Sequence, residues 1–281
     1  MNKKVITDKI VKRFQMYLYE EERSENTIQK YMRDIRFFSE WLQGREIDKT
    51  VVIEYKKELC RRYAVKSVNS ILSSINAFFV FMNWHDLKIK TLKIQRRIFA
   101  DKSKELTKAE YERLLTAAKN KKNERLYYLM QTIASTGLRV SEVKYVTCEA
   151  VRQGQAVINC KGKIRQIFLP QKLCKMLKVY IKTQNITRGA VFISKKGKPL
   201  DRSNIWKMLK DLCESANVDN TKVFPHNFRH LFARTFYSLQ KDIVRLADIL
   251  GHSSIETTRI YTIESGEEHI KLLQKMGLLR C

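Results

Sequence analysis

Helical periodicity of the apolar residues constrains the fold of this chain more than any other feature. In Ser24–Leu42 the apolar positions recur every three to four residues. The same spacing returns in four further segments and from Ser203 onward: Val51–Tyr63, Ser67–Trp84, Lys108–Ala118 and Leu126–Ser135. This spacing places apolar side chains on one face of an α-helix, where they can pack into a core. The chain is therefore predicted to be mainly α-helical.

One short segment departs from the helical pattern and predicts a β-hairpin. Gln155–Cys160 and Gln166–Leu169 carry the clearest strand signals, and Lys161-Gly162-Lys163 between them is a turn sequence. Ala190–Ser194 is a further candidate strand. The predicted fold class is mainly α with a small antiparallel β-sheet.

The helical pattern divides into two parts that a basic segment separates. Residues 1–87 are predicted to form a helical N-terminal domain, and residues 105–281 a second domain of helices and strands. Thr107 and Glu110 fit a capping box at the start of the second domain. Residues 88–104 between them are predicted to be an extended linker. The linker holds one acid and seven basic side chains: Asp101 against Lys88, Lys90, Lys93, Arg96, Arg97, Lys102 and Lys104.

A large excess of positive charge extends along the whole chain. There are 55 Lys+Arg against 29 Asp+Glu, and residues 1–100 contribute +9 and residues 101–281 +17 to the net charge of +26. Such a charge destabilises a compact state by self-repulsion unless a polyanion relieves it. Nucleic acid is therefore the expected partner. The linker is either a solvated loop or a strap across a DNA backbone, with Lys93, Arg96 and Arg97 among the contacts, and we favour the strap.

Composition also limits the class of protein. A hydrophobic content of 44% is enough for a packed core and excludes global disorder. The six cysteines show no CxxC pairing and no paired Cys/His spacing, so we expect reduced thiols and no metal site. No apolar run approaches the length that spans a membrane, and the N-terminus has no signal-peptide core. The protein is predicted to be cytoplasmic.

Three segments carry residues suited to chemistry on a phosphodiester. Arg139 lies in Thr136-Gly137-Leu138-Arg139-Val140-Ser141-Glu142, and Glu142, three residues on, can hold it in place. His226 and Arg229 share one face of a predicted helix, Pro225–Leu239. The third segment contains Leu250-Gly251-His252 and, nine residues after the histidine, Tyr261. Ser253 and Glu256 fit a capping box, which predicts a helix that begins just after His252.

The order of these residues is more specific than any one of them. A lone His-x-x-Arg is mostly a surface feature, and a tyrosine near a helix end is mostly core. Two arginines, two histidines and a tyrosine together make a cationic site with an oxygen nucleophile beside it, which suits attack on a phosphate. His230, His85 and His269 have no place in these motifs. We predict that His230 faces elsewhere on its helix and is structural.

This ordered set resembles the tyrosine recombinase (integrase) family, and the resemblance covers nearly the whole chain. It implies an N-terminal SAM-like core-binding domain in residues 1–87 and a catalytic domain in residues 105–281. The family's hairpin often reads Gly-Lys-Gly-x-Lys-x-Arg, whereas this chain has Cys160-Lys161-Gly162-Lys163-Ile164-Arg165, shorter by one residue. The catalytic set carried over is Arg139, Lys161 with Lys163 as the alternate, His226, Arg229, His252 and Tyr261, with Glu142 as an accessory acid.

The resemblance also implies a role for each residue. Tyr261 is the nucleophile, forms a 3′-phosphotyrosyl link and frees a 5′-hydroxyl. Arg139 and Arg229 hold the non-bridging oxygens. His226 takes the tyrosine proton, the hairpin lysine gives a proton to the leaving oxygen, and His252 donates a hydrogen bond to the phosphate. No metal ion and no cofactor is expected. The reaction is site-specific strand exchange, which underlies DNA integration, excision or inversion.

Two other functions remain open on the sequence. A type IB topoisomerase-like enzyme uses the same chemistry to relax supercoils as a monomer, and a catalytically silent relative only binds DNA. Residues 266–281 form a short apolar segment after the nucleophile. It either folds back on its own domain or, as the family resemblance favours, docks on a neighbouring subunit in a tetramer on two DNA sites.

Overall fold

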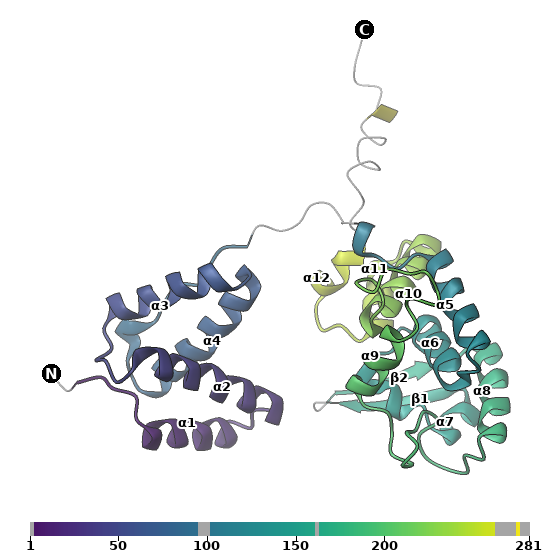
Figure 1. Cartoon of the computed structure of the whole chain (residues 1–281), viewed down its shortest axis with the longest axis horizontal. Coiled ribbons are helices and arrows are strands. Elements are labelled where there is room, and N and C mark those ends of the chain that lie inside the picture. The colour runs from purple at the N-terminus through teal and green to yellow at the C-terminus, as the bar shows by residue number, and fades with distance from the viewer. Residues whose placement is uncertain (1–2, 95–101, 161–162, 262–273, 276–281) are drawn as a thin grey trace, which may run out of the picture. The chain divides into compact units, whose positions relative to one another are not determined.

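The computed structural model describes residues 3–94, 102–160, 163–261 and 274–275. The chain divides into two compact units, Met1–Arg96 and Arg97–Cys281, and each is described by itself (Figure 1). Nothing in the described parts of the chain forms a helix with the length and apolarity needed to cross a bilayer.

Four α-helices and one 3-10 turn build the described part of the first unit. They are α1 (Asp8–Glu20), α2 (Glu25–Leu42), α3 (Lys49–Arg62), α4 (Val65–Phe81) and η1 (His85–Leu87). Phe14, Phe38, Phe78 and Phe79 are fully buried between the helices, and Phe14 meets Phe78 edge to face with ring centroids 5.2 Å apart. Burial of these rings, together with the aliphatic side chains around them, drives the packing of these amphipathic helices.

Two asparagines of α4 hold the segment after η1 against the first unit. Asn76 donates to the carbonyl of Ile89 (2.8 Å) and accepts from the same residue's N–H (2.9 Å). Asn69 makes the same pair of bonds with Leu92 (2.8 and 2.7 Å). Lys56 donates to the Lys90 carbonyl at 2.7 Å. Each side-chain amide thus replaces the strand partner that this extended backbone lacks. The first residues of the predicted linker are therefore fixed, and residues 95–101 lie outside the described residues.

In its described residues the second unit is mainly helical with one two-stranded sheet, which confirms the predicted fold class. Its elements are η2 (Lys102–Lys104), α5 (Lys108–Asn120), α6 (Glu124–Thr136), η3 (Val140–Tyr145), α7 (Cys148–Gln153), β1 (Gln155–Cys160), β2 (Lys163–Phe168), α8 (Gln171–Thr183), α9 (Arg202–Lys210), α10 (Pro225–Gln240), α11 (Ile243–Leu250), α12 (Ile255–Thr258) and η4 (Arg259–Tyr261). The Thr107–Glu110 capping box is present at the start of α5.

The hairpin has the predicted first strand, and its second strand begins earlier than predicted. β1 and β2 pair antiparallel from Gln155↔Phe168 to Cys160↔Lys163. Ile158 and Ile167 are buried, whereas Val157 and Phe168 are exposed, so one face of the sheet packs on the core.

The prediction of a third strand at Ala190–Ser194 was wrong. Two isolated bridges form there instead, Thr147↔Ala190 and Ile193↔Pro199. Val191 and Phe192 are buried in the core of the unit. The apolar run that suggested a strand therefore reflects burial of a connecting segment.

Candidate active site

Helix α10 places Arg229, the second arginine of the predicted catalytic set, in the interior of the second unit. Pro225 occupies the first turn, where a missing N–H costs nothing, and the helix continues to Gln240. The Arg229 side chain is 1% exposed. Its guanidinium donates to the carbonyls of Gly137 (2.5 Å) and Leu250 (2.7 Å). Burial and the charge of Arg139 lower the pKa of Arg229 to about 10, so it keeps its charge at neutral pH.

Gly137 makes the turn that leads from α6 to Arg139. It has φ +66°, and a Cβ there would lie 2.5 Å from the ring of Phe232. Only glycine satisfies both constraints. The turn leaves the Gly137 carbonyl aimed at Arg229 and starts η3 at Val140.

A buried carboxylate, Glu142, connects two arginines. It accepts from the Arg139 backbone N–H (2.8 Å), from Arg139 Nη1 (3.0 Å) and from Arg165 Nη2 (2.5 Å). Its side chain is 4% exposed. Burial would raise the pKa of Glu142, but the hydrogen bonds from Arg139 and the charge of Arg165 lower it below its ordinary value. The expectation that Glu142 holds Arg139 therefore agrees with the geometry, and Arg165 joins them.

Three successive carbonyls at the C-terminal end of α11 accept hydrogen bonds from three arginines. Ile249 accepts from Arg165 (2.7 Å), Leu250 from Arg229 (2.7 Å), and Gly251 from Arg139 (3.2 Å). The last carbonyls of a helix lack intrahelical partners and carry a partial negative charge. This one turn therefore orients guanidiniums from the N-cap of η3, from β2 and from α10.

His252 follows this turn and is held by two hydrogen bonds. Its Nε2 lies 3.0 Å from Arg229 Nη2, and its Nδ1 lies 2.8 Å from Thr258 Oγ1. A guanidinium can only donate, so Nε2 accepts and the proton sits on Nδ1. Burial and the charge of Arg229 lower the pKa of His252 to about 4. To donate to a phosphate, Nε2 has to gain a proton and release Arg229.

A helix begins shortly after His252, as predicted, but its cap differs from the prediction. The Ser253–Glu256 capping box was wrong, because α12 begins at Ile255 with Ser254 as its N-cap and without a side-chain cap bond. The bond between His252 and Thr258 ties the segment into a turn and a helix of one turn. Ser253 lies one residue too early to cap it.

Tyr261 packs among histidine rings at the end of this segment. It is 5% exposed, its ring is stacked at 14° on His252 with centroids 6.3 Å apart, and it meets His230 edge to face at 4.9 Å. Burial raises the pKa of Tyr261 above its ordinary value, and the charge of Arg229 opposes this. The phenol is therefore protonated at neutral pH.

His230 lies in the site, and the prediction that it faces elsewhere was wrong. Its ring is 4.3 Å from that of His226 and 4.9 Å from that of Tyr261, centroid to centroid. Residues four apart on a helix share a face, which the sequence already indicated. Burial and the charge of His226 lower the pKa of His230 to about 3, and burial also lowers the pKa of His226.

Several residues of the predicted site lie outside the described residues: Lys161, Arg96, Arg97 and nearly all of the 266–281 segment. Lys163 is described only as the first residue of β2, and Lys93 is exposed on the first unit.

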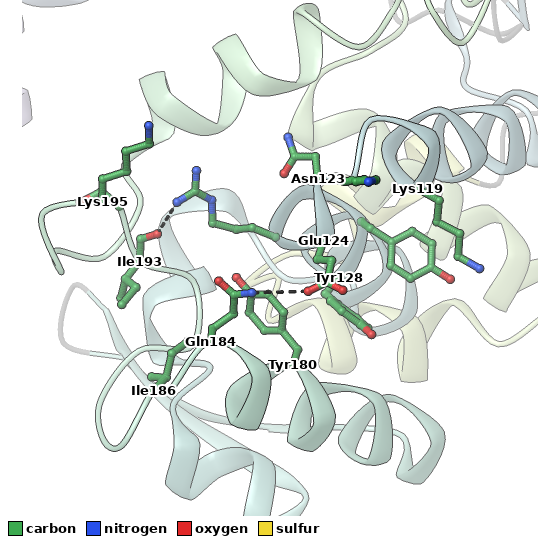
Figure 2. Close-up of a pocket in the computed structure, with 13 residues that line it drawn as sticks. Lys119, Asn123, Glu124, Tyr128, Tyr180, Gln184, Ile186, Ile193 and Lys195 are labelled. Atoms are coloured by element: carbon green, nitrogen blue, oxygen red, sulfur yellow. Dashed lines mark hydrogen bonds between the residues drawn. The ribbon is translucent and has the colours of Figure 1, made fainter.

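A pocket of the second unit lies away from these residues (Figure 2). It has a volume of about 680 Å³ and lies between the start of α6, the end of α8 and the Ile193–Lys195 loop. Arg125 donates there to the carbonyl of Ile193 at 2.8 Å. Among its described lining residues there is none of the predicted catalytic set.

Comparison with known proteins gives consistent matches over the length of the chain. Residues 104–268 match the Phage integrase family, and residues 11–86 match the "Phage integrase, N-terminal SAM-like domain". The chain is 27% identical over 290 residues to tyrosine recombinase XerA of Pyrococcus furiosus, which covers 99% of this chain and 98% of that protein. It is 29% identical over 294 residues to the TnP I resolvase of Bacillus thuringiensis, with 96% and 99% covered.

Solved structures share the fold. A lambda integrase (75–356) dimer bound to a COC′ core site matches with a TM-score of 0.75 at 16% identity, over 93% of this chain and 96% of that one. A XerH site-specific recombinase in a pre-cleavage complex with its difH substrate matches with a TM-score of 0.69 at 20% identity, over 89% and 79%.

Proposed function

The chain belongs to the phage integrase family of tyrosine recombinases, enzymes that cleave and rejoin DNA, and we propose that it exchanges strands at specific sites through a covalent link to Tyr261. One observation carries the proposal. Tyr261, His252 and Arg229 lie together in the second unit. Arg139 joins them, because it donates to the carbonyl of Gly251 at the end of α11. A catalytically silent DNA-binding protein has no need for a tyrosine packed against this cationic cluster.

The geometry supports a separate role for each of these residues in the reaction. Arg139 and Arg229 hold the two non-bridging oxygens of the scissile phosphate and stabilise the charge that develops on them. The oxygen of Tyr261 attacks phosphorus, and the bond from phosphorus to the 5′-oxygen breaks. His226, kept neutral by its lowered pKa, accepts the tyrosine proton, and the hairpin lysine, Lys161 or Lys163, protonates the 5′-oxygen. His252 bonds to the phosphate once its Nε2 is protonated.

The reverse of this step rejoins DNA. The phosphotyrosyl link keeps the phosphodiester bond energy, so a 5′-hydroxyl from another strand can attack it without a nucleotide cofactor. Attack by a different strand gives integration, excision or inversion. We propose that this exchange takes place in the cytoplasm, in a tetramer on two DNA sites, with residues 266–281 docking on the neighbouring subunit.

The proposed chemistry predicts covalent cleavage that needs no metal. Wild-type protein, incubated with a nicked duplex that carries its recombination site, should form a protein–DNA adduct on a denaturing gel in excess EDTA as fast as in Mg²⁺. The reason is that guanidiniums supply the charge stabilisation. The sequence of this duplex is chosen from inverted repeats in the DNA that flanks the gene, which are the candidate recombination site. Cleavage that stops in EDTA and returns with Mg²⁺ contradicts the proposal.

The same gel assigns the hairpin lysine. When sulfur replaces the leaving 5′-oxygen, the thiolate departs without a proton. We propose Lys161 as the acid, so Lys161→Ala should be slow on the oxygen substrate and near wild-type on the sulfur substrate. If Lys163→Ala instead is slow on the oxygen substrate and near wild-type on the sulfur substrate, Lys163 is the acid.

We further propose that the first unit and the linker bind the DNA backbone. Lys56, Lys57, Lys88 and Lys90 line one hollow of about 700 Å³ on the first unit, and the bonds from Asn69 and Asn76 fix the segment after Lys88. Lysines on a backbone that is already held in place can meet successive phosphates with less loss of entropy on binding than lysines on a free loop.

Replacing Lys93, Arg96 and Arg97 with alanine should therefore make the salt dependence of DNA binding shallower. Each lost phosphate contact reduces the slope of log K against log salt by about 0.9, so the triple variant should lose up to about 3 units. Affinity for specific and random DNA should fall about equally. The control removes three exposed lysines of α8, Lys172, Lys175 and Lys178. An equal change in both triple variants means that the linker is a solvated spacer.

A further inference from the structure

Arg165 links three segments of the second unit that are far apart in the sequence. It lies on β2 opposite Ile158, and its side chain is 16% exposed. One nitrogen donates to the carboxylate of Glu142 at 2.5 Å, and the other donates to the carbonyl of Ile249 at 2.7 Å. The hairpin, η3 and the end of α11 are thereby joined through one guanidinium.

The stem of Arg165 is packed against the turn that precedes His252. Gly251 has φ +62°, and a Cβ there would lie 2.6 Å from Cδ and 2.9 Å from Nε of Arg165. The contact therefore requires glycine at 251. The carbonyl of the same Gly251 accepts from Arg139. Any shift of Arg165 thus acts on the turn that positions both Arg139 and His252.

The single carboxylate of Glu142 is shared between two cations. Oε2 accepts from Arg165 and from the backbone N–H of Arg139, and the side chain of Arg139 reaches the carboxylate only at Oε1, through one nitrogen. Without Arg165, Oε2 can also accept from the second nitrogen of Arg139, which here bonds to the Gly251 carbonyl, because a carboxylate and a guanidinium prefer to pair through two parallel bonds. Such a pair turns Arg139 away from a phosphate and neutralises much of its charge. In the described structure the Arg139 side chain is 39% exposed.

We propose that Arg165 is a positioning residue of this site, which occupies Glu142 and the Ile249 carbonyl so that Arg139 stays oriented and available for the scissile phosphate. This inference rests on the proposed function and extends it to a residue outside the catalytic set. Arg165 acts through Arg139 and does not itself bind the reacting atoms.

The test is a double-mutant cycle with Arg165→Met and Glu142→Gln, measured as single-turnover adduct formation on the nicked duplex. Arg165→Met should lower the cleavage rate by about 10²-fold, because small displacements of a catalytic group cost that much, while DNA affinity changes less than about threefold. Arg165→Met with Glu142→Gln should recover at least about tenfold over Arg165→Met, because the competing carboxylate is gone. Arg165→Lys, which can reach only one of the two acceptors, should fall between wild type and Arg165→Met.

Three results of the cleavage and binding assays overturn the inference: a wild-type rate for Arg165→Met, an equal loss of DNA affinity and cleavage, or a double variant no faster than Arg165→Met. Urea unfolding of the four proteins of the cycle, which are wild type, Arg165→Met, Glu142→Gln and the double variant, gives a second readout that does not depend on activity. Coupling between Arg165 and Glu142 in stability is expected, and its absence also overturns the inference. If wild-type protein forms no adduct, the proposed function fails, and the unfolding cycle alone decides whether Arg165 and Glu142 act together.

Discussion

Arg229→Met should lower the rate of adduct formation by about 10³-fold or more and leave DNA affinity nearly unchanged. Removing a single donor to a developing oxyanion costs about 10²–10³-fold, and Arg229 also contacts His252, so its loss disturbs a second group. Its affinity contribution is small, because one phosphate contact is minor beside the charge of the whole chain. Single-turnover cleavage and a binding titration measure the two effects.

A neighbouring arginine provides the control for stability. Arg229→Met leaves the carbonyls of Gly137 and Leu250 without their donor, at a cost of about 1–3 kcal/mol each in unfolding free energy. Arg234 lies on the same helix and donates to the carbonyl of Leu106. Arg234→Met should therefore also destabilise the protein while cleavage at a temperature where both variants are folded stays near wild type. Equal loss of cleavage in both variants contradicts a catalytic role for Arg229.

Local patterns predicted much of the fold. β1 has the bounds expected for Gln155–Cys160, and α10 begins at Pro225 as predicted. In both cases the signal is contained in the segment itself, as a turn sequence or a proline in the first turn. The third strand at Ala190–Ser194 was wrong because periodicity in a short apolar run cannot separate a strand from a buried connection.

The parts that sequence reasoning missed depend on tertiary contacts. Arg165 belongs to the hairpin pattern, but its bonds to Glu142 and Ile249 join residues 23 and 84 positions away. The hydrogen bonds from Asn69 and Asn76 to the start of the linker also join residues that are distant in the sequence. His230 is different: its spacing from His226 was visible, and helical geometry could have placed both on one face.

Tyr261 is the residue on which the whole account depends. Its hydroxyl is the only group that Tyr261→Phe removes, while the ring contacts with His230 and His252 remain available to phenylalanine. The fold and the DNA affinity should therefore be kept, whereas covalent chemistry should be lost completely, because phenylalanine has no nucleophile. Tyr237 of α10 packs against the same cluster as Tyr261, which also contains Ala233, Leu246 and Leu250, and it provides a matched Tyr→Phe control.

The most direct measurement is the denaturing gel of protein–DNA adducts on the nicked duplex, followed by mass spectrometry of the DNA-linked peptide. Wild type and Tyr237→Phe should form the adduct, with the link on Tyr261. Tyr261→Phe should bind the duplex with unchanged affinity and form none. An adduct that persists in Tyr261→Phe, or a link mapped to another residue, contradicts the account.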